Sequence, residues 1–174
     1  MCAKKEEKKI LKSEEGLEKD FLEMAGEIIS SDEFIKMKKY KQHIHGNTYD
    51  HSVRVAYLCY RHCIKHKSKV NVGELVRGAL LHDYFLYDLH GEDSNVSGIV
   101  HGYTHPSRAL ENAIRAYPDL SPTERDAIRR HMFPLTPIPP RTRCGWLVCY
   151  YDKIAALEEY FGKNVGRVKK KNCY

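Results

Sequence analysis

Residues 72–84 read VGELVRGALLHDY, an apolar helical pattern that ends in an adjacent histidine and aspartate, His82 and Asp83. Burying both side chains is expensive unless something satisfies them, because an unpaired buried charge costs several kcal/mol or is neutralised. Taken alone, such a pair is most often a surface pair or a hydrogen-bonded pair. A divalent metal ion is the alternative explanation, and it requires further ligands elsewhere in the chain.

Further candidate ligands lie on both sides of this pair. Each falls within a separate predicted helix or at its start: His51, His105, His131 and Asp152. Helical bundles build metal sites in their cores from imidazole and carboxylate groups on converging helices. The six side chains together favour a metal site over an isolated surface pair.

Helix starts are predicted where a capping residue precedes apolar periodicity. A first packed helix is expected over 21–29, and later helices are expected to start at these caps: Ser30, Thr48, Asn71, Thr104 and Ser121. Pro106 is acceptable in a first helical turn. The segment before it, 90–102, is rich in Gly, Ser, Asp and Asn and is expected to form a long loop.

The last predicted helix covers residues 143–161. Its expected apolar side consists of Trp146, Leu147, Tyr150, Ile154, Ala155 and Leu157. No segment of the chain has a convincing strand pattern and no internal repeat is present. The sequence therefore predicts an all-α fold, a single-domain helical bundle.

Length and composition indicate one globular domain. The chain has 174 residues, of which 42% are hydrophobic and 30% charged, enough to form a real core. No apolar run approaches the roughly 20 residues that span a bilayer, so no membrane association is expected. The N-terminus is rich in lysine and glutamate and lacks a signal-peptide pattern, so a cytoplasmic location is expected.

Charge divides the chain into three segments. Residues 1–20 form a charged N-terminal extension with equal numbers of acidic and basic side chains, and 21–161 form the helical domain. Residues 162–174 form a basic C-terminal tail that holds most of the net charge of +6: Lys163, Arg167, Lys169, Lys170 and Lys171. Such a tail is most often a solvated end, so nucleic-acid binding is not expected.

The six cysteines show no CxxC or zinc-finger spacing. Cys59, Cys63 and Cys149 fall among apolar residues of predicted helices, where a free thiol behaves as a small hydrophobic group. We expect reduced cysteines and no structural disulfide.

The order of these motifs strongly resembles the HD-domain superfamily of metal-dependent phosphohydrolases. The matching segments extend over about residues 45–160 and are YDHSVRVA at 49–56, ALLHD at 79–83, HPSRA at 105–109, RH at 130–131 and DKI at 152–154. Each segment is weak alone, whereas their combined order and spacing is specific. Among the branches of the family, the order is most similar to that of the bacterial symmetrical diadenosine tetraphosphate hydrolases.

The resemblance implies a helical domain in which one metal ion is bound by His51, His82, Asp83 and Asp152. The presence of His105 and His131 is similar to the two-metal branches, in which Asp83 would bridge the ions. His101 precedes His105 by one helical spacing, so either histidine could be the ligand, and His105 is preferred because Pro106 and Ala109 fit the family pattern. Imidazole and carboxylate ligands favour borderline divalent ions such as Fe, Mn, Co or Zn.

The expected function is therefore a metal-dependent phosphohydrolase that cleaves a phosphoester or phosphoanhydride of a nucleotide or other small phosphorylated substrate. Its nucleophile would be a metal-bound hydroxide. The predicted catalytic residues are Asp83, with Arg54 and Lys153 as the cations that neutralise phosphate charge. A surface cation or a helix salt bridge is the ordinary role of such side chains, and it is the more common one for Lys153.

One departure from the family pattern supports a rival hypothesis. The family often has a lysine a few residues after the His-Asp pair, whereas this chain has YFLY at 84–87. The rival is a non-catalytic, metal-stabilised module that binds a nucleotide or a protein partner. A full set of six candidate ligands favours the enzyme, and a substrate panel would separate the two.

Overall fold

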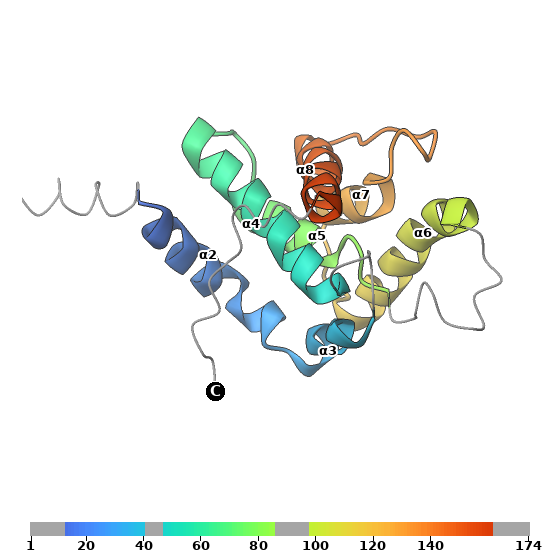
Figure 1. Ribbon diagram of the computed structural model, residues 1–174, viewed down its shortest axis with the longest axis horizontal. Helices are drawn as coiled ribbons and strands as arrows, with labels where there is room; N and C mark the ends of the chain where they lie inside the picture. Colours follow the sequence, from blue (N-terminus) through green and yellow to red (C-terminus); the bar gives the residue numbers. More distant parts are fainter. Residues whose placement is uncertain (1–12, 41–46, 86–97, 162–174) are drawn as a thin grey trace, which may run out of the picture.

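The computed structural model describes residues 13–40, 47–85 and 98–161, and in these ranges the chain is helical with no strand, which confirms the all-α prediction. The elements in chain order are α2 (Glu14–Ile29), α3 (Asp32–Ile35), the 3-10 helix η1 (Lys36–Lys39), α4 (Thr48–His66), α5 (Val72–Leu81), α6 (Gly98–Ala116), α7 (Pro122–Arg130) and α8 (Arg143–Tyr160) (Figure 1).

Helix α5 is the central element of the bundle. It packs against α2, α4, α6, α7 and α8, and Figure 1 shows it behind α4 with α7 and α8 on one side and α2 on the other. Its side chains Leu75, Ala79 and Leu80 are completely buried. Because α5 leads directly into His82 and Asp83, its central position places this pair inside the fold.

Helices α5 and α7 approach each other closely at a glycine. A Cβ atom built on Gly78 would lie 3.2 Å from Cβ of Ala127 and 3.5 Å from Cα of Glu124. A larger side chain at Gly78 would therefore push α7 outward. Since α7 ends directly before His131, this contact fixes the distance between His131 and the residues at the end of α5.

Of four predicted caps, two are confirmed and two are displaced by a single residue. Asn71 and Ser121 cap α5 and α7 as predicted, and Ser121 forms a complete capping box with Glu124. The prediction of Ser30 was wrong, because Ser31 accepts the hydrogen bond from Phe34 N while Ser30 ends α2. Thr48 was also wrong as a cap, because Asn47 accepts from Asp50 N. Adjacent polar residues compete for the same role, and sequence spacing cannot rank them.

Two helices begin earlier than predicted. Helix α2 starts at Glu14, seven residues before Phe21, and its extra turns bury Leu17. Helix α6 starts at Gly98, so Thr104 is not its cap and Pro106 lies inside the helix. Packing compensates for the backbone hydrogen bond that Pro106 cannot donate, since α6 contacts both α5 and α7.

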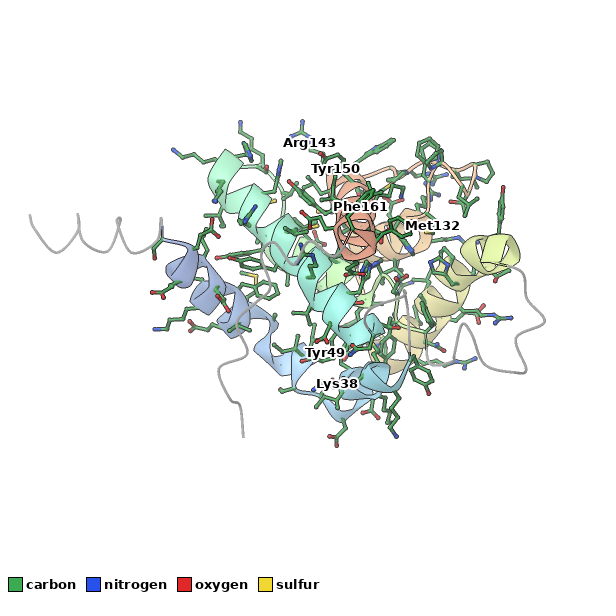
Figure 2. The ribbon with its side chains drawn as sticks, in the orientation of Figure 1. Lys38, Tyr49, Met132, Arg143, Tyr150 and Phe161 are labelled. Atoms are coloured by element: carbon green, nitrogen blue, oxygen red, sulfur yellow. The ribbon has the colours of Figure 1, made fainter. Side chains whose placement is uncertain are left out.

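The buried side of α8 differs from the prediction. Trp146, Tyr150 and Leu157 are exposed, and the side facing the bundle consists of Cys144, Val148, Cys149, Asp152 and Ala155. The helix is apolar on both sides, so periodicity alone cannot identify the inner one. Figure 2 labels Arg143, Tyr150 and Phe161 along this helix, from its first residue to just past its last.

Cysteines in the described ranges agree with the expectation of free thiols. Cys59, Cys63, Cys144 and Cys149 are buried and unbridged. Within the same ranges, none of the helices combines the length and the hydropathy that a membrane-spanning helix needs.

Candidate metal centre

The six predicted ligands come from five helices and meet in the core. His51 lies in the first turn of α4, His105 lies within α6 and Asp152 lies within α8. The other three follow the last residue of a helix: His82 and Asp83 after α5, and His131 after α7. All six side chains are buried. The first turn of α4, the C-terminal ends of α5 and α7, and the inner sides of α6 and α8 therefore meet at one place in the core.

Four of these residues form a first group around Asp152 and Asp83. Oδ1 of Asp152 lies 3.2 Å from Nε2 of His51 and 3.6 Å from Nε2 of His82. Oδ2 of Asp83 lies 3.3 Å from Nε2 of His82 and 3.9 Å from Nε2 of His51. One ligand atom from each of the four residues lies within 4.8 Å of the others, a spacing that can hold one metal ion.

A second group forms on the other oxygen of the same carboxylate. Oδ1 of Asp83 lies 3.2 Å from Nε2 of His105 and 3.3 Å from Nε2 of His131. The two imidazoles face each other, with their Nε2 atoms 2.8 Å apart. These three residues also meet the 4.8 Å spacing. Asp83 is thus shared by both groups, with one oxygen toward each.

Two of the imidazoles are oriented by main-chain carbonyl groups. Nδ1 of His82 donates to Ala79 O at 2.7 Å, and Nδ1 of His131 donates to Ile128 O at 2.8 Å. Each ring must therefore carry its proton on Nδ1 when neutral, which leaves the Nε2 lone pair directed into the centre. Burial also lowers the pKa of His131, which favours its neutral form.

The third oriented imidazole, that of His51, is held by Glu159, a carboxylate that the sequence analysis did not identify. Nδ1 of His51 donates to Glu159, at 3.1 Å from Oε1 and 3.2 Å from Oε2. Glu159 lies seven residues after Asp152 on α8, so two helical turns put both carboxylates on the same side of the helix. That i, i+7 spacing is the signal that could have identified it. The arrangement matches the carboxylate–histidine pairs that orient metal ligands in proteins.

The carboxylates and imidazoles stabilise each other's charged forms. Burial alone would lower the pKa of His51, but hydrogen bonds to Asp152 and Glu159 raise it to about 9. Burial likewise opposes a charge on His82, yet the negative charge of Asp83 and the contact with Asp152 raise its pKa to about 10. The same contacts outweigh burial for Asp83 and Asp152 and hold the pKa of both carboxyls below their usual range. Both carboxylates are therefore ionised in the core.

This donor set fits divalent metal ions. Buried ionised carboxylates need positive charge close by, and Nε2 of His82 is buried without a hydrogen-bond partner in the described part of the chain. A cation between the carboxylates would supply the charge and would be bound by this nitrogen in place of its proton. Nitrogen and oxygen donors together suit borderline first-row ions better than Mg or Ca, which prefer all-oxygen sites.

The two predicted cationic residues are engaged within the chain. The Arg54 guanidinium is almost completely buried and forms an ion pair with Glu158. The Lys153 ammonium donates to His131 O at 2.8 Å and to Cys149 O at 3.1 Å, and lies 3.9 Å from Oδ2 of Asp152. Lys153 is therefore beside the centre, whereas Arg54 ties α4 to α8.

The residues after the His-Asp pair are packed rather than open. Tyr84 is buried and stacks on Phe34, with centroids 6.5 Å apart, and Phe85 meets the His105 ring edge-on at 5.9 Å. Aromatic packing thus occupies the first two positions where a lysine often stands in the resembled family. The side chain of His101, the alternative to His105, lies outside the described part of the structure.

Comparison with known proteins gives one match. The sequence model of the HD domain matches residues 48–157, which is more than half of the chain and includes all six residues of the centre. Neither a curated protein nor a solved structure matches the chain significantly.

Proposed function

Because the chain belongs to the HD-domain family, we propose that it is a metal-dependent phosphohydrolase acting on a nucleotide or another small phosphorylated compound. The observation that carries the proposal is the position of Asp83, whose two carboxylate oxygens face two separate groups of buried ligands. Two cation positions that share one carboxylate are the arrangement used for in-line displacement at phosphorus.

His51, His82, Asp83 and Asp152 would hold one ion, and Asp83, His105 and His131 a second. When bound, such a pair of ions supplies a reactive nucleophile from water at neutral pH and neutralises charge on the attacking and leaving oxygens. The protein's part is to fix the ligands in advance. The Nδ1 contacts of His51, His82 and His131 do this, because a ring held on one nitrogen presents the other in a single direction.

No side-chain nucleophile is needed for this chemistry. Cys149 is the thiol nearest to Asp152 on α8, but it is buried, its Sγ donates to Phe133 O, and burial raises its pKa. A thiol in this state is a poor nucleophile. The proposal therefore assigns bond cleavage to activated water.

We propose Lys153 as the side chain that contacts substrate phosphate in place of the family's missing lysine. Its side chain is 41% exposed and its ammonium lies beside Asp152. An incoming phosphate would compete with the carbonyl groups of His131 and Cys149 for this ammonium. Arg54 is the weaker candidate, because moving it toward substrate would leave Glu158 without its ion pair.

Dinucleoside polyphosphates are the finer substrate proposal, based on the similarity of motif order to the diadenosine tetraphosphate hydrolases. Iron, manganese, cobalt and zinc are the proposed ions. The rival proposal is a metal-stabilised module without catalytic activity, favoured by the aromatic residues that replace the lysine after Asp83.

A substrate panel on metal-loaded protein tests the proposal. Phosphomonoesters, phosphodiesters and dinucleoside polyphosphates are assayed with Mn and with Fe, using wild type, His51→Ala and Asp83→Asn. The matched control is His66→Ala, which removes an exposed histidine of α4 far along the helix from His51. Turnover by wild type and the control alone supports the enzyme. Bound metal without turnover of any substrate in the panel supports the non-catalytic module. Equal turnover by all variants excludes this centre as the active site.

A further inference from the structure

The outward side of α8 is aromatic and apolar where a surface helix is normally polar. Five large side chains on or just after this helix are about half exposed or more: Trp146 (47%), Tyr150 (58%), Leu157 (54%), Tyr160 (68%) and Phe161 (66%). Other α8 residues, including Asp152, form the opposite side, in the core. The same helix thus supplies a ligand to the centre and an apolar face to the surroundings.

The spacing of this face is that of a helix-pairing seam. Trp146, Tyr150, Lys153, Leu157 and Tyr160 follow one another at intervals of four, three, four and three residues. This alternation averages 3.5 residues and is the pattern by which two helices pack along their length. We name these five residues the α8 seam. They cover 15 residues, or about four turns.

We propose that the α8 seam is the contact between two copies of this chain, with the two α8 helices antiparallel. A twofold axis between residues 153 and 154 exchanges residue 150 with residue 157 and residue 146 with residue 161, directly beside residue 160. Trp146 would then face Tyr160 of the second copy, and Tyr150 would face Leu157. The seam is its own complement about this axis, as an isologous interface requires.

Four of the five charged residues of α8 are engaged within the chain. Asp152 and Glu159 contact His51, and Glu158 pairs with Arg54. The ammonium of the one charged seam residue, Lys153, donates to carbonyl oxygens of its own chain. The three carboxylates are therefore satisfied within the chain, and the Lys153 ammonium is turned toward the centre. Arg143 is a single exposed cation at the start of the helix, whereas contact with an apolar second copy needs no charge.

The exposed area of the α8 seam and the fixed positions of its side chains suit a dimer. Large aromatic side chains present about 150–250 Å² each, so the four apolar seam residues together with Phe161 offer on the order of 500 Å² per chain. Two copies would bury on the order of 1,000 Å², the lower bound for a specific interface. Trp146 is held by the Phe133 ring at 5.5 Å and Tyr150 by the Tyr151 ring at 5.1 Å. Side chains that are already ordered lose less entropy on association.

The test is the mass of the full chain in solution, measured by light scattering over a range of micromolar concentrations. Twice the chain mass of 20.2 kDa is expected for wild type. Tyr150→Glu and Leu157→Lys should each weaken the dimer at least 100-fold, with helical content and bound metal unchanged. The control is Met24→Glu, which charges an apolar residue of α2 that is also about half exposed and should remain dimeric.

Mixing the two variants tests the antiparallel arrangement. Residue 150 of one chain faces residue 157 of the other, so a mixture of the Tyr150→Glu and Leu157→Lys chains should regain the dimer through an opposite-charge pair. A wild type that is monomeric throughout, or a dimer that both variants retain, overturns the proposal. A mixture that stays monomeric overturns the antiparallel pairing.

Discussion

Glu159 accepts a hydrogen bond from Nδ1 of His51, although 108 residues separate them in the chain. The contact sets the direction of Nε2 of His51, which lies 3.2 Å from Asp152. Asp152 and Glu159 share one side of α8, so a single helix both approaches the centre directly and orients another of its side chains. Glu159 is a positioning residue, acting through His51.

Glu159→Gln is expected to lower metal affinity about 10- to 100-fold, the usual loss when a partner of a ligand histidine is removed. An amide at this position holds His51 without the negative charge that raises its basicity. Zinc or manganese titration by calorimetry measures the change. Glu158→Gln is the matched control, because the neighbouring carboxylate pairs with Arg54 and should leave metal affinity within about twofold. Equal losses in both variants would assign the effect to α8 packing.

Asp83→Asn should reduce the metal content of both groups, whereas His105→Ala should reduce only the second. The reason is that Asp83 gives one oxygen to each group, whereas His105 belongs to the second group alone, at Oδ1 of Asp83. Elemental analysis of protein purified without a metal-binding tag gives the ratio of ions to chain. We expect close to two ions for wild type, one for His105→Ala and fewer than one for Asp83→Asn. Unchanged content in Asp83→Asn would contradict the shared carboxylate.

Metal binding at neutral pH should release protons. The pKa of His51 is raised to about 9 and that of His82 to about 10, so both imidazoles are protonated at pH 7 in the metal-free protein. An ion must displace these protons, and we expect about one to two to leave per ion in the first group. The affinity for the metal ion should therefore increase as the pH is raised to about 9 to 10 and should be weakest below neutral pH.

Calorimetry in two buffers of different ionisation enthalpy counts the released protons. The His51→Ala variant should release fewer than wild type. Identical heats in both buffers would mean that the two histidines are already neutral at pH 7.

A bound ion should stabilise the fold by mass action. At a free concentration 100 times the dissociation constant the gain is about 2.7 kcal/mol. Thermal unfolding with and without a chelator measures it, and the increase in melting temperature should disappear in Asp83→Asn. A chelator that leaves the wild-type melting curve unchanged would show that the fold does not depend on the ion.

Ser121→Ala should lower the free energy of unfolding by about 1 kcal/mol, the usual effect of losing an N-cap side chain. Ser121 begins α7 with a capping box, and α7 leads to His131. Urea unfolding gives the value. Ser30→Ala removes a hydroxyl that bonds Gly26 O at the end of α2 and should cost less. A larger loss at Ser30 would reverse the assignment of caps.

The predicted ligands could be identified from the sequence because burying imidazole and carboxylate groups among apolar residues costs free energy unless the groups are paired or bind a metal ion. Glu159 is harder to identify: its i, i+7 spacing from Asp152 is a signal, but a glutamate pair near the end of a helix ordinarily faces water, and tertiary packing brings Glu159 to His51. Periodicity could not identify the inner side of α8 either, since both sides are apolar and the α8 seam has the same spacing as a buried helix face.

Local signals were right where one residue type had no competitor. Ser121 with Pro122 and Glu124 predicted the start of α7 correctly. Pro106 misled, because proline normally marks a first helical turn, whereas α6 continues for eight residues before it. Packing around α6 outweighs that preference: a Cβ at Gly102 would clash with Leu135, so the connector after α7 lies directly against this part of the helix.

The separation of His51 and Asp152 along the chain has a consequence for chain entropy. An ion held by both would close a loop of 101 residues. A covalent cross-link of that span restricts the unfolded chain by about 4.7 kcal/mol. Coordination bonds that exist only in the folded chain leave the unfolded chain unrestricted, and they stabilise the fold through the free energy of binding instead, by holding the first turn of α4 to the middle of α8. The ion would therefore act as a reversible cross-link between α4 and α8, two helices that contribute ligands 101 residues apart in the chain.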